Sequence, residues 1–111
     1  MPANGKNITN SFEYFLVLGE KPLKSNTTYT KNIIATPVNS NMPKNHKAVM
    51  RYDVAEWFIT HFTQVGDLVL DPNCGIGTTL VACQNNDRRF IGIELVKEYY
   101  NMAIERINKD E

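Results

Sequence analysis

The second half of the chain carries a hydrophobic pattern that predicts alternating helices and strands. Apolar side chains at helical spacing, beginning with Met50, Val54 and Trp57, predict a first helix, and Gly66 is suited to cap its C-terminal end. Short apolar runs bounded by polar or turn residues predict two strands. The predicted elements are a helix over 50–62, a strand over 67–71, a helix over 78–85, a strand over 90–94 and a helix over 97–108.

The pattern also predicts the buried face of the last helix and the elements in the first half of the chain. Helical spacing predicts one apolar face on the last helix, formed by Tyr100, Ala103, Ile104 and Ile107. Residues 12–18, F-E-Y-F-L-V-L, predict a largely buried strand, and 33–35 form a candidate short strand. The Pro-, Asn- and Ser-rich stretch 36–45 predicts a boundary between an N-terminal arm with one or two strands, 1–45, and a core portion, 46–111.

The residues between the two predicted strands indicate a ligand site. Asp71 to Thr79, D-P-N-C-G-I-G-T-T, form a glycine-containing turn between a strand and a helix. Glu94 follows Asp71 by twenty-three residues and ends the second apolar run. A glycine turn followed by an acid at the end of the next strand is how a βαβ unit holds a nucleoside. The turn lets the ligand approach the backbone, and the acid accepts hydrogen bonds from ribose hydroxyls.

The spacing of the glycines restricts the kind of nucleoside. The turn is G-x-G, and Leu80 stands where the third glycine of the dinucleotide fingerprint would fall. The triphosphate-binding pattern G-x-x-x-x-G-K-[ST] is absent from the sequence. A ligand with a ribose and no phosphates therefore fits better than a dinucleotide, and S-adenosylmethionine is one such ligand.

The same residues resemble a known family. Residues 69–79, V-L-D-P-N-C-G-I-G-T-T, resemble the V-L-D-P-F-x-G-x-G-T-T motif of the amino-group DNA methyltransferases, which methylate adenine N6 or cytosine N4. Residues 88–107 are similar to the family's R-x-x-I-G-I-E…Y…A…R-I tail, and 46–49 resemble its H-P-A-x element. The resemblance covers 46–107 and implies an α/β fold. The fold would be part of the Rossmann-like fold of the class I S-adenosylmethionine-dependent methyltransferases, which is a three-layer sheet with a parallel βαβ core.

The resemblance also implies a set of cofactor-binding residues. Glu94 would take the ribose hydroxyls, and residues 46–48 would lie over the methionine moiety. Thr78 and Thr79 open a helix whose free N–H groups favour a carboxylate such as the methionine end. Asn73 stands where the family usually has Phe. The implied cofactor-binding positions are His46, Lys47, Ala48, Asp71, Asn73, Gly75, Gly77, Thr78, Thr79 and Glu94.

One element of the family is missing from the sequence. The family's chemistry uses a D/N/S-P-P-aromatic loop, whose aromatic residue stacks on a flipped base. The prolines stand at positions 2, 22, 37, 43 and 72, and no two are adjacent. We therefore expect the S-adenosylmethionine-binding, C-terminal part of a site-specific DNA methyltransferase, with no catalytic residue of its own and inactive alone. A separate chain could carry the loop and the target-recognition segment, and DNA would be bound by the complete enzyme.

Two other interpretations stay open. A noncatalytic remnant or interaction module could retain the same fold. An RNA or small-molecule methyltransferase fits the general fold, but it does not fit D-P-x-x-G-x-G-T-T together with the R-I tail. Nothing in the sequence distinguishes adenine from cytosine as the target, because the first residue of the missing loop carries that information.

Composition and charge set the remaining expectations. At 111 residues and 42% hydrophobic content, the sequence is typical of one globular domain. Twelve basic and twelve acidic residues cancel, so the net charge offers little for nonspecific DNA binding. Two small basic groups, formed by Lys44, Lys47 and Arg51 and by Arg88 with Arg89, are interpreted as solvated surface.

The cysteines and the apolar stretches argue against a disulfide-rich, metal-binding or membrane protein. Cys74 and Cys83 do not form a disulfide framework, and no His or Cys spacing is typical of a metal site. No apolar stretch reaches the length of a membrane span or a signal peptide. We therefore expect no metal, no membrane association and a cytoplasmic location.

Overall fold

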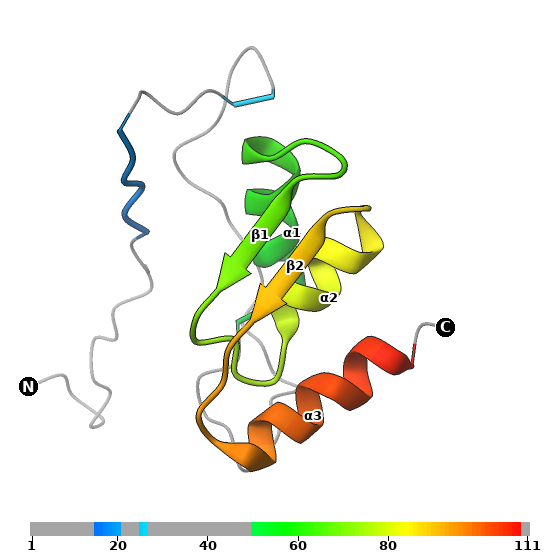
Figure 1. The fold of residues 1–111 in the computed structure, drawn as a ribbon. Helices are drawn as coiled ribbons and strands as arrows, with labels where there is room; N and C mark the ends of the chain where they lie inside the picture. The colour runs from blue at the N-terminus through cyan, green and yellow to red at the C-terminus, as the bar shows by residue number, and fades with distance from the viewer. Residues whose placement is uncertain (1–14, 21–24, 27–49, 110–111) are drawn as a thin grey trace, which may run out of the picture.

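The structure is a computed structural model that describes residues 15–20, 25–26 and 50–109 (Figure 1). Its regular elements are α1 (Tyr52–Phe62), β1 (Leu68–Asp71), α2 (Thr78–Asn85), β2 (Arg89–Gly92) and α3 (Lys97–Asn108). The order helix, strand, helix, strand, helix is the predicted one, and every boundary lies within two residues of its predicted position. The local hydrophobic pattern therefore determines the elements of this part of the chain.

The two strands pair in parallel, and α2 connects them. The register places Leu68 beside Arg89 at one end and Asp71 beside Gly92 at the other. Figure 1 shows both strands running side by side toward α3. The predicted parallel βαβ core is confirmed, and the carboxyl ends of both strands meet at the edge where α3 lies.

One face of this sheet is packed against helices. Ala55 and Ile59 of α1 meet Ala82 and Cys83 of α2 in the centre of the core, and Val69 and Phe90 of the sheet pack against them. Ala82 and Cys83 have no exposed surface. Small side chains at these positions allow the two helices and the sheet to approach closely, so this part of the domain has a dense core.

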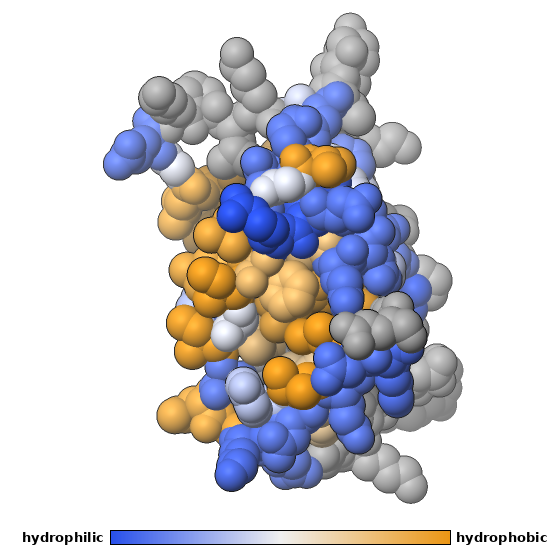
Figure 2. All heavy atoms as spheres, turned by 45° about the vertical axis from the view of Figure 1, so that its right-hand side comes forward, coloured by the Kyte–Doolittle hydropathy of each residue, from blue (hydrophilic) through white to orange (hydrophobic). Residues whose placement is uncertain are grey.

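The other face of the sheet is exposed and apolar. Side chains alternate along a strand, so the neighbours of Val69 and Phe90 point the opposite way. The exposed apolar side chains at the sheet and directly after it are Leu68, Leu70, Ile91 and Ile93, each about half exposed. Figure 2 shows that apolar side chains gather on one side of the molecule. Within the described residues, this face has no helix over it, so they contain two of the three layers of the expected fold.

Three local expectations need correction. Gly66 does not cap α1, because the chain leaves the helix at Thr63 in an extended conformation. Gly66 instead adopts a left-handed φ of 87° in the turn before β1, where its N–H donates to the Asp87 carbonyl. The predicted apolar face of α3 is only partly buried, because Ala103 is buried while Tyr100 and Ile104 are exposed. The third concerns the start of the chain.

The described residues of the predicted first strand, 15–18, are not in a strand, and they are exposed. Phe15 packs its ring 4.9 Å from that of Phe58 on α1. A strand is stable only when a neighbouring strand pairs with it. Among the described residues the sheet consists of β1 and β2, and neither pairs with 15–18. The candidate strand 33–35 and the boundary at 36–45 lie outside the described residues, so the division into arm and core stays a prediction.

Candidate functional site

The turn between β1 and α2, residues 72–77, is held in a conformation that requires glycine twice. Gly75 and Gly77 have φ values of 54° and 85°, in the left-handed region that other residues rarely adopt. The Cys74 N–H donates to the Ile93 carbonyl at 3.0 Å, and the Gly77 N–H donates to the Cys74 carbonyl at 2.8 Å. We call residues 72–77 the glycine turn; it is bonded both within itself and to the segment after β2.

Glu94 joins that segment to the glycine turn through its carboxylate. The Gly75 N–H donates to Oε1 at 2.9 Å, and the Val96 N–H donates to Oε2 at 2.8 Å. A carboxylate offers about four acceptor positions, so two backbone donors leave room for further donors such as hydroxyls. The acid that the spacing predicted beside the turn does lie there, and it also shapes the turn.

The start of α2 supplies backbone donors at the same place. Gly77 is the N-cap residue, and no side chain caps the helix. The Val81 N–H donates to the Gly77 carbonyl, so the helical bonds begin there. The amides at the first positions of a helix have no partner within it, and they favour negatively charged groups. Thr78 and Thr79 occupy these positions, as the sequence predicted.

A hollow of about 370 Å³ lies between the glycine turn, the start of α2 and the start of α3. This volume is within the range of about 300–1,000 Å³ that is usual for small-molecule sites. The predicted residues that line it are Asp71, Asn73, Gly75, Thr78, Thr79 and Glu94. Gly77 is not among the lining residues, because it is buried under Ala103 of α3. His46, Lys47 and Ala48 lie outside the described residues.

The sequence did not predict five of the residues that line the hollow. These are Met50, Cys74, Ile76, Val96 and Tyr99. Val96 and Tyr99 follow Glu94 within five residues, so their position at the carboxyl end of β2 was a usable signal. The inward direction of Tyr99 depends on how α3 is rotated, which the spacing alone does not determine.

The chemical groups in the hollow favour binding over nucleophilic catalysis. Burial raises the pKa of the Cys74 thiol, and the negative charges of Asp71 and Glu94 raise it further. The thiol therefore stays protonated near neutral pH, and a protonated thiol is a poor nucleophile. No cluster of His, Cys, Asp and Glu within the described residues could hold a metal ion.

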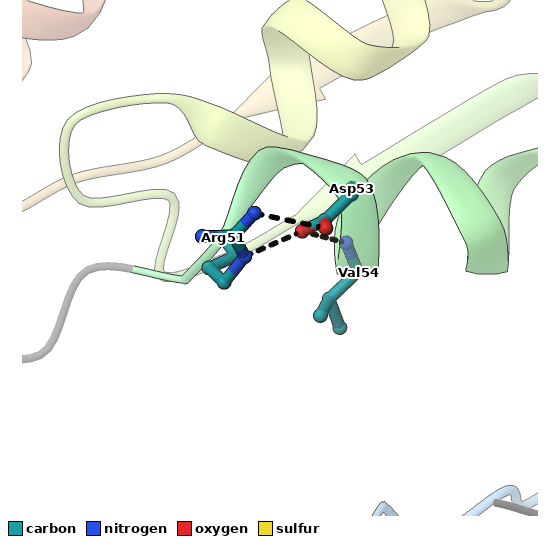
Figure 3. A network of polar contacts seen from close by, with 3 residues as sticks. All are labelled: Arg51, Asp53 and Val54. Carbon is teal, nitrogen blue, oxygen red and sulfur yellow. Dashed lines mark hydrogen bonds and ion pairs between the residues drawn. The ribbon is translucent and has the colours of Figure 1, made fainter. Parts of the chain in front are cut away.

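Two of the basic side chains that could contact DNA, those of Arg51 and Arg88, are engaged in local bonds. Arg51 forms a two-point pair with Asp53 at the start of α1, with nitrogen–oxygen distances of 2.9 and 3.0 Å (Figure 3). Arg88 is half buried rather than solvated, because its guanidinium donates to Thr63 and to the Asn86 carbonyl. Both guanidinium groups therefore have partners within the protein. Among the helices that the structure describes, none is both long and apolar enough to cross a membrane.

A parallel βαβ unit with its glycine turn at the carboxyl end of the sheet defines a Rossmann-like α/β protein. A family model described as DNA methylase, covering the N6 and N4 enzymes, matches residues 1–105. The chain therefore belongs to the N6/N4 DNA methylase family. This confirms the family that the motifs indicated.

Individual relatives agree with the family assignment. The type II methyltransferase M.SmaI of Serratia marcescens is 45% identical over 65 residues, which are 59% of this chain and 22% of the relative. The type II methyltransferase M.HhaII of Haemophilus parahaemolyticus is 32% identical over 85 residues, which are 76% of this chain and 37% of the relative.

A solved structure shows the same arrangement in space. The structure of M1.HpyAVI in complex with S-adenosylmethionine superposes with a TM-score of 0.65 and 36% sequence identity. The superposition covers 78% of this chain and 44% of that protein. The chain thus spans less than half the length of each of these relatives.

Proposed function

We propose that this chain is the cofactor-binding part of a site-specific DNA methyltransferase that uses S-adenosylmethionine to methylate adenine N6 or cytosine N4. One observation carries the proposal. Glu94, the glycine turn and the start of α2 surround a single hollow. Glu94 would accept hydrogen bonds from ribose hydroxyls, and the glycine turn would allow the ligand to approach the backbone. The start of α2 would donate hydrogen bonds to a carboxylate.

The groups around the hollow suit the parts of this cofactor. The remaining acceptor positions of Glu94 suit two ribose hydroxyls, and the free amides at Thr78 and Thr79 suit the methionine carboxylate. Gly75 presents backbone with no side chain in the way. The roles proposed for Asn73 and for residues 46–48 rest on the family resemblance alone. The bound cofactor would supply the methyl group, and the residues of this chain would hold and orient it.

We propose further that the catalytic loop and the target-recognition segment of the complete enzyme come from outside these 111 residues. The sequence contains no Pro-Pro pair, and the relatives are more than twice as long as the regions matched here. The apolar face formed by Leu68, Leu70, Ile91 and Ile93 is where the remainder of the enzyme would pack, because exposed apolar surface of this kind favours burial. DNA would then be bound by the assembled enzyme.

The first prediction concerns cofactor binding. Calorimetric titration of the folded 111-residue chain with S-adenosylmethionine is expected to give a dissociation constant in the micromolar range. Glu94→Ala is expected to weaken binding by at least about 1–2 kcal/mol, because hydrogen bonds to a charged group are lost. Glu94→Gln should lose less, because its amide oxygen still accepts hydrogen bonds.

Glu105→Ala provides the matched control, because Glu105 is an exposed glutamate on α3. It should bind the cofactor as the unchanged chain does. Circular dichroism should accompany each titration, because Glu94 also bonds the backbone of Gly75 and Val96. Unchanged affinity in a folded Glu94→Ala variant would remove Glu94 from the site, and a folded chain that binds nothing would favour a noncatalytic remnant.

The second prediction concerns catalysis. The purified chain is expected to transfer no methyl group to DNA above background, because it lacks the Pro-Pro-aromatic loop that holds the target base. Incubation of DNA with methyl-labelled S-adenosylmethionine would measure this directly. A full-length family enzyme assayed in parallel serves as the positive control. Transfer by this chain alone would contradict the proposed division of functions.

A further inference from the structure

The glycine turn is in direct contact with α3. A Cβ atom added to Gly77 would lie 2.9 Å from the Ala103 Cβ and 3.2 Å from its Cα. Real Cβ atoms are almost never found as close as the first of these distances, so no side chain larger than hydrogen fits between turn and helix. The backbone of the turn therefore rests on α3, and the position of that helix limits the position of the turn.

Arg106 lies three residues after Ala103 and so projects from the same side of α3. Its Nη1 donates to the Ile76 carbonyl at 2.9 Å and to the Thr78 Oγ1 at 2.9 Å. Both acceptors are uncharged, and the side chain is half buried. Burial lowers the pKa of Arg106 from its usual value, but the guanidinium remains charged at neutral pH. One cationic nitrogen thus bonds the glycine turn and the first residue of α2 together.

These two bonds orient the backbone of the glycine turn and of the residue that begins α2. The peptide bond between Ile76 and Gly77 is planar, and its carbonyl and N–H point in opposite directions. When Arg106 holds the carbonyl, the Gly77 N–H is directed to the Cys74 carbonyl, which it meets at 2.8 Å. Arg106 also engages the hydroxyl of Thr78, which is buried.

We infer that Arg106 is a positioning residue for the cofactor site, one that holds the glycine turn and the start of α2 in their binding geometry from behind. The inference rests on the proposed function, because it assumes that the hollow binds S-adenosylmethionine. It also assigns different roles to the two threonines. The Thr78 hydroxyl serves the interior of the fold, which leaves the Thr79 hydroxyl as the one available to the ligand.

The test compares Arg106→Met with Arg88→Met in the full 111-residue chain. Methionine keeps an unbranched apolar stem and removes the hydrogen bonds. Arg88 is a matched control because it is also half buried and donates to Thr63 and Asn86, away from the hollow. By calorimetry, Arg106→Met is expected to weaken S-adenosylmethionine binding about tenfold, whereas Arg88→Met should stay within about twofold of the unchanged chain.

A second measurement does not depend on the cofactor. The backbone amide signals of Gly75 and Gly77 in a nitrogen–proton NMR spectrum report the geometry of the turn itself. They are expected to shift or broaden in Arg106→Met and to remain in place in Arg88→Met. Loss of general stability would affect both variants, so only a positioning role predicts this difference.

The outcomes separate the two proposals. If the unchanged chain binds no cofactor, the proposed function fails, and the glycine signals alone decide the role of Arg106. If Arg106→Met does not fold, Arg106→Lys is measured in the same two ways, and we expect displaced glycine signals because the shorter side chain loses the reach of Nη1. Unchanged glycine signals in the folded variant, or equal effects of the Arg106 and Arg88 variants on the turn, would overturn the inference.

Discussion

Replacing Gly77 with alanine is expected to lower the free energy of unfolding by about 2–5 kcal/mol. Two costs add together. A left-handed φ, here 85°, costs an alanine about 1–2 kcal/mol, and overpacking against a neighbour costs about 1–3 kcal/mol. The neighbour is Ala103, whose Cβ would lie 2.9 Å from the added methyl group. Urea unfolding followed by circular dichroism measures the loss.

Gly66→Ala separates the two costs. Gly66 has nearly the same φ, 87°, but an added Cβ there would meet nothing within 4 Å. We expect this control to lose only the conformational cost of about 1–2 kcal/mol. The difference between the variants then measures the contact between the glycine turn and α3. Equal losses would show that α3 does not confine the turn, which would also weaken the inference about Arg106.

The second large effect is expected at the contact between Leu80 of α2 and Gly92 of β2. A Cβ added to Gly92 would overlap with the Leu80 Cδ1 and lie 3.0 Å from the Cys74 Sγ. Leu80 is 4% exposed, so Leu80→Ala should cost about 2–5 kcal/mol through the cavity that it leaves. Gly92→Ala should cost about 1–3 kcal/mol, because the leucine must move.

The double variant tests whether these two costs share one cause. In the Leu80→Ala background, the methyl group of Gly92→Ala enters the space that the leucine has left. We therefore expect the double variant to lose about 1–3 kcal/mol less than the sum of the single losses. Urea unfolding of all four proteins measures this coupling. Losses that add within about 0.5 kcal/mol would mean that the side chain of Leu80 is not what excludes a larger residue at position 92.

Much of the fold follows from short-range features of the sequence. The helical spacing of the apolar residues and the two apolar runs predicted every described element, because such periodicity marks which side chains share a face. The G-x-G pattern and the offset of Glu94 predicted that the glycine turn and this acid meet at one edge of the sheet. The reason is general: parallel strands joined by a helix bring their carboxyl ends together.

Other features depend on partners that are distant in the sequence. The rotation of α3 is one. The helical pattern predicted one apolar face that includes Ala103, but not that Ala103 packs against the glycine turn or that Arg106 faces inward. Gly66 is another, because its partner, Asp87, lies in the turn two residues before the other strand begins. Neither contact can be predicted from the spacing of apolar residues along the sequence.

The sequence by itself therefore determined the elements, their order, the family and most of the residues around the hollow. Only the tertiary structure decided that Glu94 bonds the glycine turn, that Gly77 is buried rather than exposed to the hollow, and that Arg106 holds the turn from behind. The physical reason is the range of the interactions. Periodicity and turn chemistry act between neighbouring residues, whereas these contacts join residues that meet only after the elements have packed.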